Sequence, residues 1–171
     1  YVLLMMPYRD ILPAIAADVL RTGATGLGLL SSAMSTGALL GTLFLSAAGE
    51  IRPRGRYFLG AALLESVLLS LFATSRIFAL SLALLALAGI GHGFFIPLSN
   101  TLLQAYAAPE MRGRVIGMNM FVWSLQPLGT IAMGAAADRI GPAEALLGSV
   151  VTAAAIYLFA LAVSRRMRTL P

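Results

Sequence analysis

Long apolar runs, separated by short loops that are alternately rich and poor in arginine, constrain this chain more than any other feature. Each run has about the 20 residues that a helix needs to cross the hydrocarbon core of a bilayer. Because lipid offers no partners to backbone polar groups, runs of this length must be helices, and they are too long for barrel strands. The sequence predicts an all-α membrane protein with a six-helix transmembrane bundle. The predicted spans are Tyr1–Leu20, Leu27–Ala48, Tyr57–Ser75, Ile77–Leu98, Val115–Ala137 and Ala143–Val163.

Composition supports a location in the lipid bilayer. Hydrophobic residues make up 59% of the chain and charged residues 11%, whereas a soluble domain carries about 25% charged residues. The net charge of +5 rests on arginine, because the chain has no lysine. These arginines flank the apolar runs, so membrane topology explains them better than nucleic-acid binding does. Cysteine is absent, so we expect no disulfide and no thiolate metal site.

The distribution of arginine predicts which side of the membrane each loop faces. Cytoplasmic loops carry an excess of positive charge. We therefore place the more basic set of loops, together with the C-terminus, on the cytoplasmic side of the inner cell membrane. That set holds Arg52, Arg54, Arg56, Arg112, Arg114, Arg165, Arg166 and Arg168, and the opposite set holds Arg21, Arg76 and Arg139.

The first run has the character of a helix whose beginning lies upstream. It starts at Tyr1 without an initiator methionine or the basic segment of a secretion signal, so we do not expect a cleaved signal peptide. The simplest expectation is that residues 1–171 are the C-terminal half of a transporter built from repeats.

Prolines and glycines interrupt several runs. Proline inside a membrane helix is tolerated where neighbouring protein or a water-filled cavity satisfies the freed backbone groups. Such helices suit a protein that alternates between two states. The interruptions are Pro7 and Pro13 in the first run, Gly37-x-x-x-Gly41 in the second, Gly89, Gly91, Gly93 and Pro97 in the fourth, and Pro127 and Gly129 in the fifth. Spacing of the Gly37-x-x-x-Gly41 type is typical of close helix packing.

Three loop segments and two longer stretches carry a family resemblance. The loops read GEIRPRGR from Gly49, PEMRGRV from Pro109 and GAAADRIG from Gly134. The stretches are GIGHGFFIPLSNTLLQAYAAPEMRGRVIGM and QPLGTIAMGAAADRIG. Together they resemble the C-terminal half of a major facilitator superfamily transporter, in the branch of the enterobactin exporter and related drug-efflux proteins. The first loop departs from the family signature, because Arg52 stands where an aspartate falls.

This resemblance implies helices seven to twelve of a twelve-helix fold, with the first one truncated. It also implies an N-terminal six-helix half as partner and a small amphipathic substrate of the siderophore or drug class. Transport would be secondary, by proton antiport with alternating access, and would need no cofactor. A second hypothesis is a non-transporting half-transporter, a remnant that only scaffolds a membrane complex.

Polar loop residues are candidates for gating as the two halves move. Arginines at helix ends bond terminal carbonyls and carboxylates, and such bonds break and re-form during rocking. The alternative is that they only anchor the topology. The candidates are Arg54, Gly55, Arg56, Glu110, Arg112, Gly113, Arg114, Asp138 and Arg139.

Ionisable residues inside the spans are the coupling and transport candidates, because charge is expensive in lipid. Arg9 and Asp10 stand in the proline-interrupted first run, and neighbours in sequence point about 100° apart on a helix. At least one of them should therefore meet a partner elsewhere. Glu65 lies roughly 12 Å into the third run. His92 is the only histidine; it is either a proton-exchanging group or a buried packing residue, and no ligand spacing around it favours a metal.

Five further polar or aromatic residues are substrate-path candidates. Asn100 and Gln104 share a helix face, as do Asn119, Trp123 and Gln126. If both faces look inward, they line a path for a bulky substrate; otherwise they bond neighbouring helices. The clusters of leucine, phenylalanine and methionine elsewhere are predicted to face lipid or to pack.

Enzymatic functions find little support in the sequence. No Gly-x-Ser-x-Gly segment accompanies the histidine, so an intramembrane serine hydrolase is not indicated. The chain also lacks a Walker loop, so it carries no sign of an ATP-driven pump.

Overall fold

The computed structural model describes residues 1–49 and 54–163, with the backbone alone at position 54. These residues form helices, turns and short connections, and no strand occurs among them, which confirms the predicted all-α class. The helices are α1 (Tyr8–Ala14), the π-helix η1 (Ile15–Val19), α2 (Ala24–Ala47), α3 (Arg54–Thr74), α4 (Phe78–Tyr106), the 3-10 turn η2 (Pro109–Met111), α5 (Arg112–Ser124), α6 (Gln126–Ile140) and α7 (Pro142–Val163).

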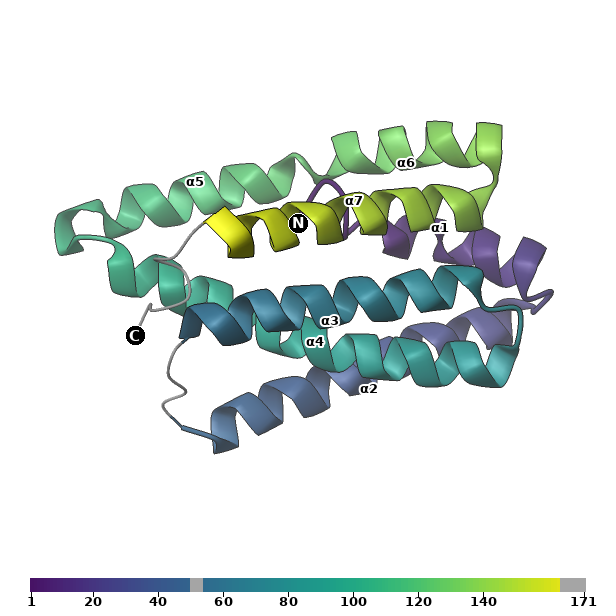
Figure 1. The fold of residues 1–171 in the computed structure, drawn as a ribbon, viewed down its shortest axis with the longest axis horizontal. Coiled ribbons are helices and arrows are strands. Elements are labelled where there is room, and N and C mark those ends of the chain that lie inside the picture. Colours follow the sequence, from purple (N-terminus) through teal and green to yellow (C-terminus); the bar gives the residue numbers. More distant parts are fainter. Residues whose placement is uncertain (50–53, 164–171) are drawn as a thin grey trace.

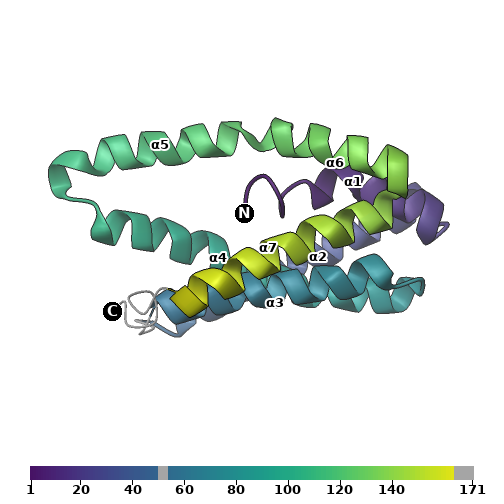
Figure 2. The ribbon, with the colours of Figure 1, turned by 45° about the horizontal axis from the view of Figure 1, so that its top comes forward.

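The long helices lie side by side along the longest axis of the molecule (Figure 1). Helix α4 packs against both α2 and α3, α3 packs on α7, and α7 packs on α6. Helices α5 and α6 follow one another along one side, which Figure 2 shows after a rotation. Five stretches of the described chain are long and apolar enough to cross a membrane, one of them running from Pro109 to Ile140 through α5 and α6.

The first run packs one of its faces into the hydrophobic core. Its side chains Met5, Tyr8 and Ile15 are almost completely buried. They belong to one hydrophobic core together with Leu30 of α2, Phe72 of α3 and residues of α4, α6 and α7. The run is not a continuous helix, because residues 1–7 form turns and a π-helix follows α1. Pro7 and Pro13, which lack a backbone donor, account for the irregularity.

Helix α4 continues past Pro97 to Tyr106, eight residues beyond the predicted end of the fourth run. Proline cannot bond the carbonyl four residues before it, which is that of Gly93. The Thr42 hydroxyl of α2 donates to this carbonyl at 3.1 Å. The same hydroxyl lies 2.9 Å from the Ala38 carbonyl of its own helix, so its one hydrogen is shared between the two carbonyls. The Gly93 carbonyl thus keeps a polar partner on the neighbouring helix, and α4 continues past Pro97.

The fifth run is broken where the sequence predicts a kink. Helix α5 ends at Ser124 and α6 begins at Gln126, with Pro127 in its first turn. The missing proline donor and the steric restriction on the preceding residue explain the break. The remaining spans lie within a few residues of their predicted limits.

The contact between α2 and α4 is made by glycines. A Cβ added to Gly37 or Gly41 of α2 would meet the backbone carbonyl of Ala86 or Ile90 in α4. In the other direction, Gly89 and Gly93 meet backbone carbonyls of α2. The predicted close-packing role of Gly37-x-x-x-Gly41 is confirmed, and its partners are two glycines of the fourth run.

The described arginines separate between the two ends of the bundle. Arg56, Arg112 and Arg114 stand at the end where α2 and α4 finish, near the left of Figure 1. Arg21, Arg76 and Arg139 stand at the opposite end. This matches the alternation in the sequence, while the side that faces the cytoplasm remains a prediction. Arg52, Arg165, Arg166 and Arg168 lie outside the described residues.

Candidate transport site

A polar cluster is buried among the apolar helices. Glu65 of α3 is completely buried and His92 of α4 is 8% exposed. The His92 Nδ1 atom lies 3.1 Å from Glu65 Oε1. The Tyr1 hydroxyl lies 2.9 and 3.0 Å from the two Glu65 carboxylate oxygens, and 2.6 Å from His92 Nδ1. Three residues from three segments thus form one hydrogen-bonded group, which we call the Tyr1–Glu65–His92 cluster.

Close packing of α3 on α4 positions the acid and the imidazole. A Cβ on Gly91 would lie 2.9 Å from the Ala61 carbonyl oxygen and 3.2 Å from Glu65 Cβ. Only a glycine therefore lets α4 approach α3 this closely one residue before His92. The tyrosine comes from the turns of the first run, which lies in the core beside both helices.

Aromatic and small apolar residues surround the cluster. Ala61, Ala62 and Phe95 form a second hydrophobic core, against which Tyr1, Phe58 and Tyr157 pack. The Tyr1 and Phe95 rings stack with centroids 4.0 Å apart, and Phe58 stacks on Phe95 at 4.6 Å. Because these surroundings are apolar, a carboxylate without a charged or hydrogen-bonding partner would be strongly disfavoured at this position.

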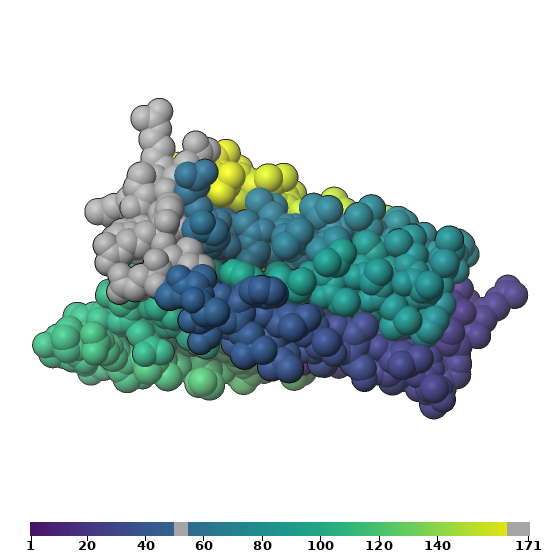
Figure 3. All heavy atoms as spheres, turned by 90° about the horizontal axis from the view of Figure 1, so that it is seen from below, coloured from purple at the N-terminus to yellow at the C-terminus, as the bar shows by residue number. Residues whose placement is uncertain are grey.

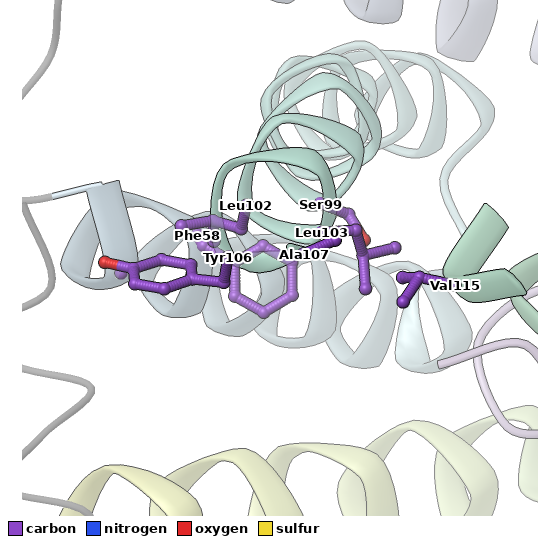
Figure 4. A pocket seen from close by; sticks show the side chains of 8 residues that line it. Phe58, Ser99, Leu102, Leu103, Tyr106, Ala107 and Val115 are labelled. Atoms are coloured by element: carbon purple, nitrogen blue, oxygen red, sulfur yellow. The ribbon is translucent and has the colours of Figure 1, made fainter. Parts of the chain in front are cut away.

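An apolar pocket of about 390 Å³ opens beside the end of α4. It lies between the beginning of α3, the last turns of α4 and the beginning of α5 (Figure 4). Its lining consists of Gly55, Phe58, Ser99, Leu102, Leu103, Tyr106, Ala107 and Val115. In Figure 4 the Tyr106 hydroxyl points away from the other labelled side chains. The pocket thus offers a largely hydrophobic surface with aromatic rings.

Arg9 and Asp10 lie apart from the cluster, on exposed parts of α1. The Arg9 Nε atom donates to the Tyr8 hydroxyl at 3.2 Å. Asp10 Oδ2 accepts a 2.6 Å hydrogen bond from the Thr130 hydroxyl of α6. As expected from their positions on the helix, the two side chains find different partners, and Asp10 has its partner within this chain.

The substrate-path candidates do not meet in the pocket. Asn100 and Gln104 are exposed, whereas Asn119, Trp123 and Gln126 are half-buried. The pocket is built from the neighbouring positions 99, 102, 103 and 106 of α4 and includes none of these five residues. Leucine and phenylalanine, which we expected only to face lipid or to pack, thus line the pocket instead.

The gating candidates divide between the two ends of the bundle. Arg56, Glu110, Arg112 and Arg114 are exposed at one end, where the buried Gly55 lines the pocket. Gly113 at the same end has open space around its Cα. Asp138 and Arg139 are exposed at the opposite end, at the close of α6. The side chain of Arg54 lies outside the described residues.

Sequence reasoning identified Glu65 and His92 separately, and missed both their contact and the role of Tyr1. A tyrosine near the edge of an apolar run carries no signal that distinguishes it from other interfacial tyrosines. The aromatic stack through Phe58 and Phe95 was also missed, since phenylalanine is common in such runs. Within residues 1–49 and 54–163, no group of three or more histidine, aspartate or glutamate side chains is arranged to hold a metal ion.

Comparison with known proteins agrees with this architecture. The model of the Major Facilitator Superfamily matches residues 2–170. The chain is 33% identical over 140 residues to the multidrug efflux pump Tap of Mycolicibacterium fortuitum. That alignment covers 81% of this chain and 34% of the pump, so the chain spans about a third of its relative's length. No solved structure matches. The chain therefore belongs to the Major Facilitator Superfamily.

Proposed function

We propose that this member of the Major Facilitator Superfamily exports small amphipathic molecules by proton antiport with alternating access. The relative named above is a multidrug efflux pump, which supports efflux in general. The proposal of proton antiport with alternating access rests on one feature of this chain. This feature is a set of exposed polar groups on the broken first helix and its neighbours.

Polar side chains at membrane depth remain exposed beside α1. Arg9 lines a small polar cavity of about 190 Å³ together with Ser31 and Ser35 of α2. On the other side of α1, Asp10 bonds Thr130 of α6. Charged groups within spans face protein or water rather than lipid. We infer that the exposed surface of α1, which carries both Arg9 and Asp10, faces a water-filled path shared with a second six-helix half.

The surface of α2 is consistent with such a partner. Figure 3 shows α2 lying open along this face of the molecule. Less of α2 is buried than of α3 or α4, although still less is buried of α7 and of the stretch Pro109–Ile140. What distinguishes α2 is its exposed hydroxyl side chains, which are Ser31, Ser32, Ser35 and Thr36. An N-terminal half of the same polypeptide is the partner we propose, and the fraction of the relative left unmatched leaves room for it. The C-terminus would then be cytoplasmic.

Broken helices provide the means for alternating access. The first run combines turns, α1 and a π-helix, and the fifth run changes direction at Leu125. Half-broken helices near the centre of the membrane are the moving or binding elements of many secondary transporters. The apolar pocket at the more basic end suits a substrate with aromatic or aliphatic parts, of the drug or siderophore class.

Efflux of ethidium, a planar amphipathic cation, tests the proposed function. The complete transporter is produced in cells, which are loaded with the dye and then energised. We expect export that stops when a protonophore collapses the proton gradient. Asp10→Asn should abolish this export while membrane insertion is retained, and Asp18→Asn, at an exposed position of η1, should export normally.

The mass of the native polypeptide separates the two hypotheses for the chain. A mass roughly twice the 17.9 kDa of residues 1–171 would indicate a fused second half. A mass near 17.9 kDa, with no export of the dye, would leave a non-transporting half-transporter or scaffold.

A further inference from the structure

We propose that Glu65 and His92 are the proton-binding pair of this transporter, and that the aromatic stack Tyr1–Phe95–Phe58 links the pair to the apolar pocket. The inference rests on the proposed antiport and gives it a site. It also assigns the pocket lined by Phe58 as the site where a bound substrate promotes release of the proton from the pair.

The Glu65–His92 pair can share one proton without net charge. With one shared proton the pair is neutral overall, either as a carboxylic acid beside a neutral imidazole or as a carboxylate beside an imidazolium. The 3.1 Å distance between Glu65 Oε1 and His92 Nδ1 lets the proton occupy either atom. Release of this proton to water leaves one net negative charge, while the Tyr1 hydroxyl remains a donor to the carboxylate.

That negative charge is costly where the pair lies. Glu65 is completely buried, in contact with a core of Ala61, Ala62 and Phe95. A buried carboxylate without a paired cation is strongly disfavoured in such surroundings. The pair therefore holds its proton while closed and loses it when water or a cationic substrate stabilises the charge.

Other titratable groups face the pair from each neighbouring segment. Tyr8 and Arg9 of α1 lie within electrostatic range of Glu65, and Arg9 is bonded to Tyr8 rather than to the acid. From α7, Tyr157 packs against the same small core of Ala61, Ala62 and Phe95 as Tyr1 does. The Tyr157 hydroxyl is buried and has no hydrogen-bond partner among the residues described. Arg9 is thus a cation of a neighbouring segment, and it is exposed and bonded to Tyr8 rather than to the pair.

The Glu65–His92 pair is fixed, whereas the Tyr1 hydroxyl is movable. Close contact of Gly91 with α3 holds Glu65 and His92 at one separation. Tyr1 instead belongs to the turns before Pro7, which have no continuous helical ladder. Displacement of this segment breaks the bonds from the Tyr1 hydroxyl to both partners while the pair itself stays intact.

The aromatic stack connects the pair to the substrate. Phe58 lines the pocket and stacks on Phe95, and Phe95 stacks on Tyr1. A ligand that enters the pocket must contact Phe58, and a shift of this ring displaces the stack that holds Tyr1. Contact alone does not establish coupling between two sites, so the link needs a direct measurement.

Proton release on substrate binding provides that measurement. The complete purified transporter, in weakly buffered detergent micelles near pH 7, is mixed with ethidium, and a pH indicator records the protons released. We expect release from the wild type and none from Glu65→Gln, although the variant still binds ethidium because the amide preserves the shape and hydrogen bonds. Glu144→Gln, at an exposed position of α7, is the matched control and should behave as the wild type.

Three further variants test the pair and its link. His92→Asn should also lose proton release, which gives a second test if Glu65→Gln fails to fold. Phe58→Leu should reduce the protons released per ethidium bound, whereas Phe159→Leu, exposed on α7, should not. Tyr1→Phe keeps the ring on Phe95 but removes the hydroxyl, and should shift the pH range of release. Infrared spectra should show a carboxylic acid band that is lost in Glu65→Gln.

The outcomes separate failure of the site from failure of the function. Undiminished release in folded Glu65→Gln or His92→Asn would overturn the assignment of the pair and leave antiport standing. Undiminished release in Phe58→Leu would overturn the link to the pocket. If ethidium binds to the wild type and no proton is released, the antiport itself fails, and the assignment falls with it.

Discussion

Helix α4 packs closely on two sides by two different means. Toward α2, Gly89 and Gly93 bring backbone against backbone, with the neutral Thr42 hydroxyl as the polar side chain beside them. Toward α3, Gly91 makes room for a buried acid and imidazole. Neighbouring positions of α4 therefore make two kinds of contact. Among the described residues, the contact with α2 contains no titratable side chain, and the contact with α3 contains Glu65 and His92. The first is suited to hold the bundle together, and the second to respond to a changing charge.

Filling the glycine contact should have the largest effect on stability. In Gly89→Leu the added Cβ would overlap the Met34 carbonyl of α2, which cannot move without shifting the helix. We expect the free energy of unfolding to fall by about 3 kcal/mol, measured by thermal unfolding in detergent micelles. Gly28→Leu is the control, because the Cβ position of Gly28 is open. Equal stability of both variants would show that this contact does not hold α2 on α4.

Breaking the polar contact should have an intermediate effect. Glu65→Leu removes the carboxylate from the cluster and leaves the Tyr1 hydroxyl and His92 Nδ1 only each other as partners, and we expect a loss of about 2 kcal/mol. Glu65→Leu combined with His92→Leu should lose less than the sum of the single changes, because both charged partners are then replaced. Strict additivity in the same unfolding assay would contradict a coupled pair.

A single hydroxyl beside the glycine contact should have the smallest effect. Thr42→Val removes the donor to the Gly93 carbonyl, and interhelical bonds of this kind contribute about 0.6 kcal/mol in membranes. Pro97→Ala restores a backbone donor for that carbonyl, so Thr42→Val should have no effect in its presence. The exposed Thr36→Val serves as the control. A full effect of Thr42→Val in the Pro97→Ala background would show that Gly93 is not the relevant acceptor.

The comparison also shows where sequence reasoning succeeds and where it stops. The Gly37-x-x-x-Gly41 spacing predicted a close contact correctly, because small residues one turn apart must share a face. The spacing did not indicate which helix the motif packs on, and only the structure shows that it packs on α4 near Gly89 and Gly93. The fourth run was predicted to end at Leu98, and α4 continues to Tyr106, because a hydropathy rule applied to one run does not include packing against another helix. The first run was expected to be helical, and its prolines make it irregular over residues 1–7.

The sequence by itself determined the membrane class, the approximate limits of most spans, and the family, whereas the first of the six predicted spans is not among the five found in the described residues. Hydropathy and arginine distribution are sums over neighbouring residues, and the energy of transfer into lipid depends on little else. The tertiary structure decided that Tyr1, Glu65 and His92 meet, across separations of 64 and 91 positions. Which face of a helix meets its neighbour depends on rotation about the helix axis and on crossing angle. Both are set by the packing of glycines and side chains between helices, which no single span encodes.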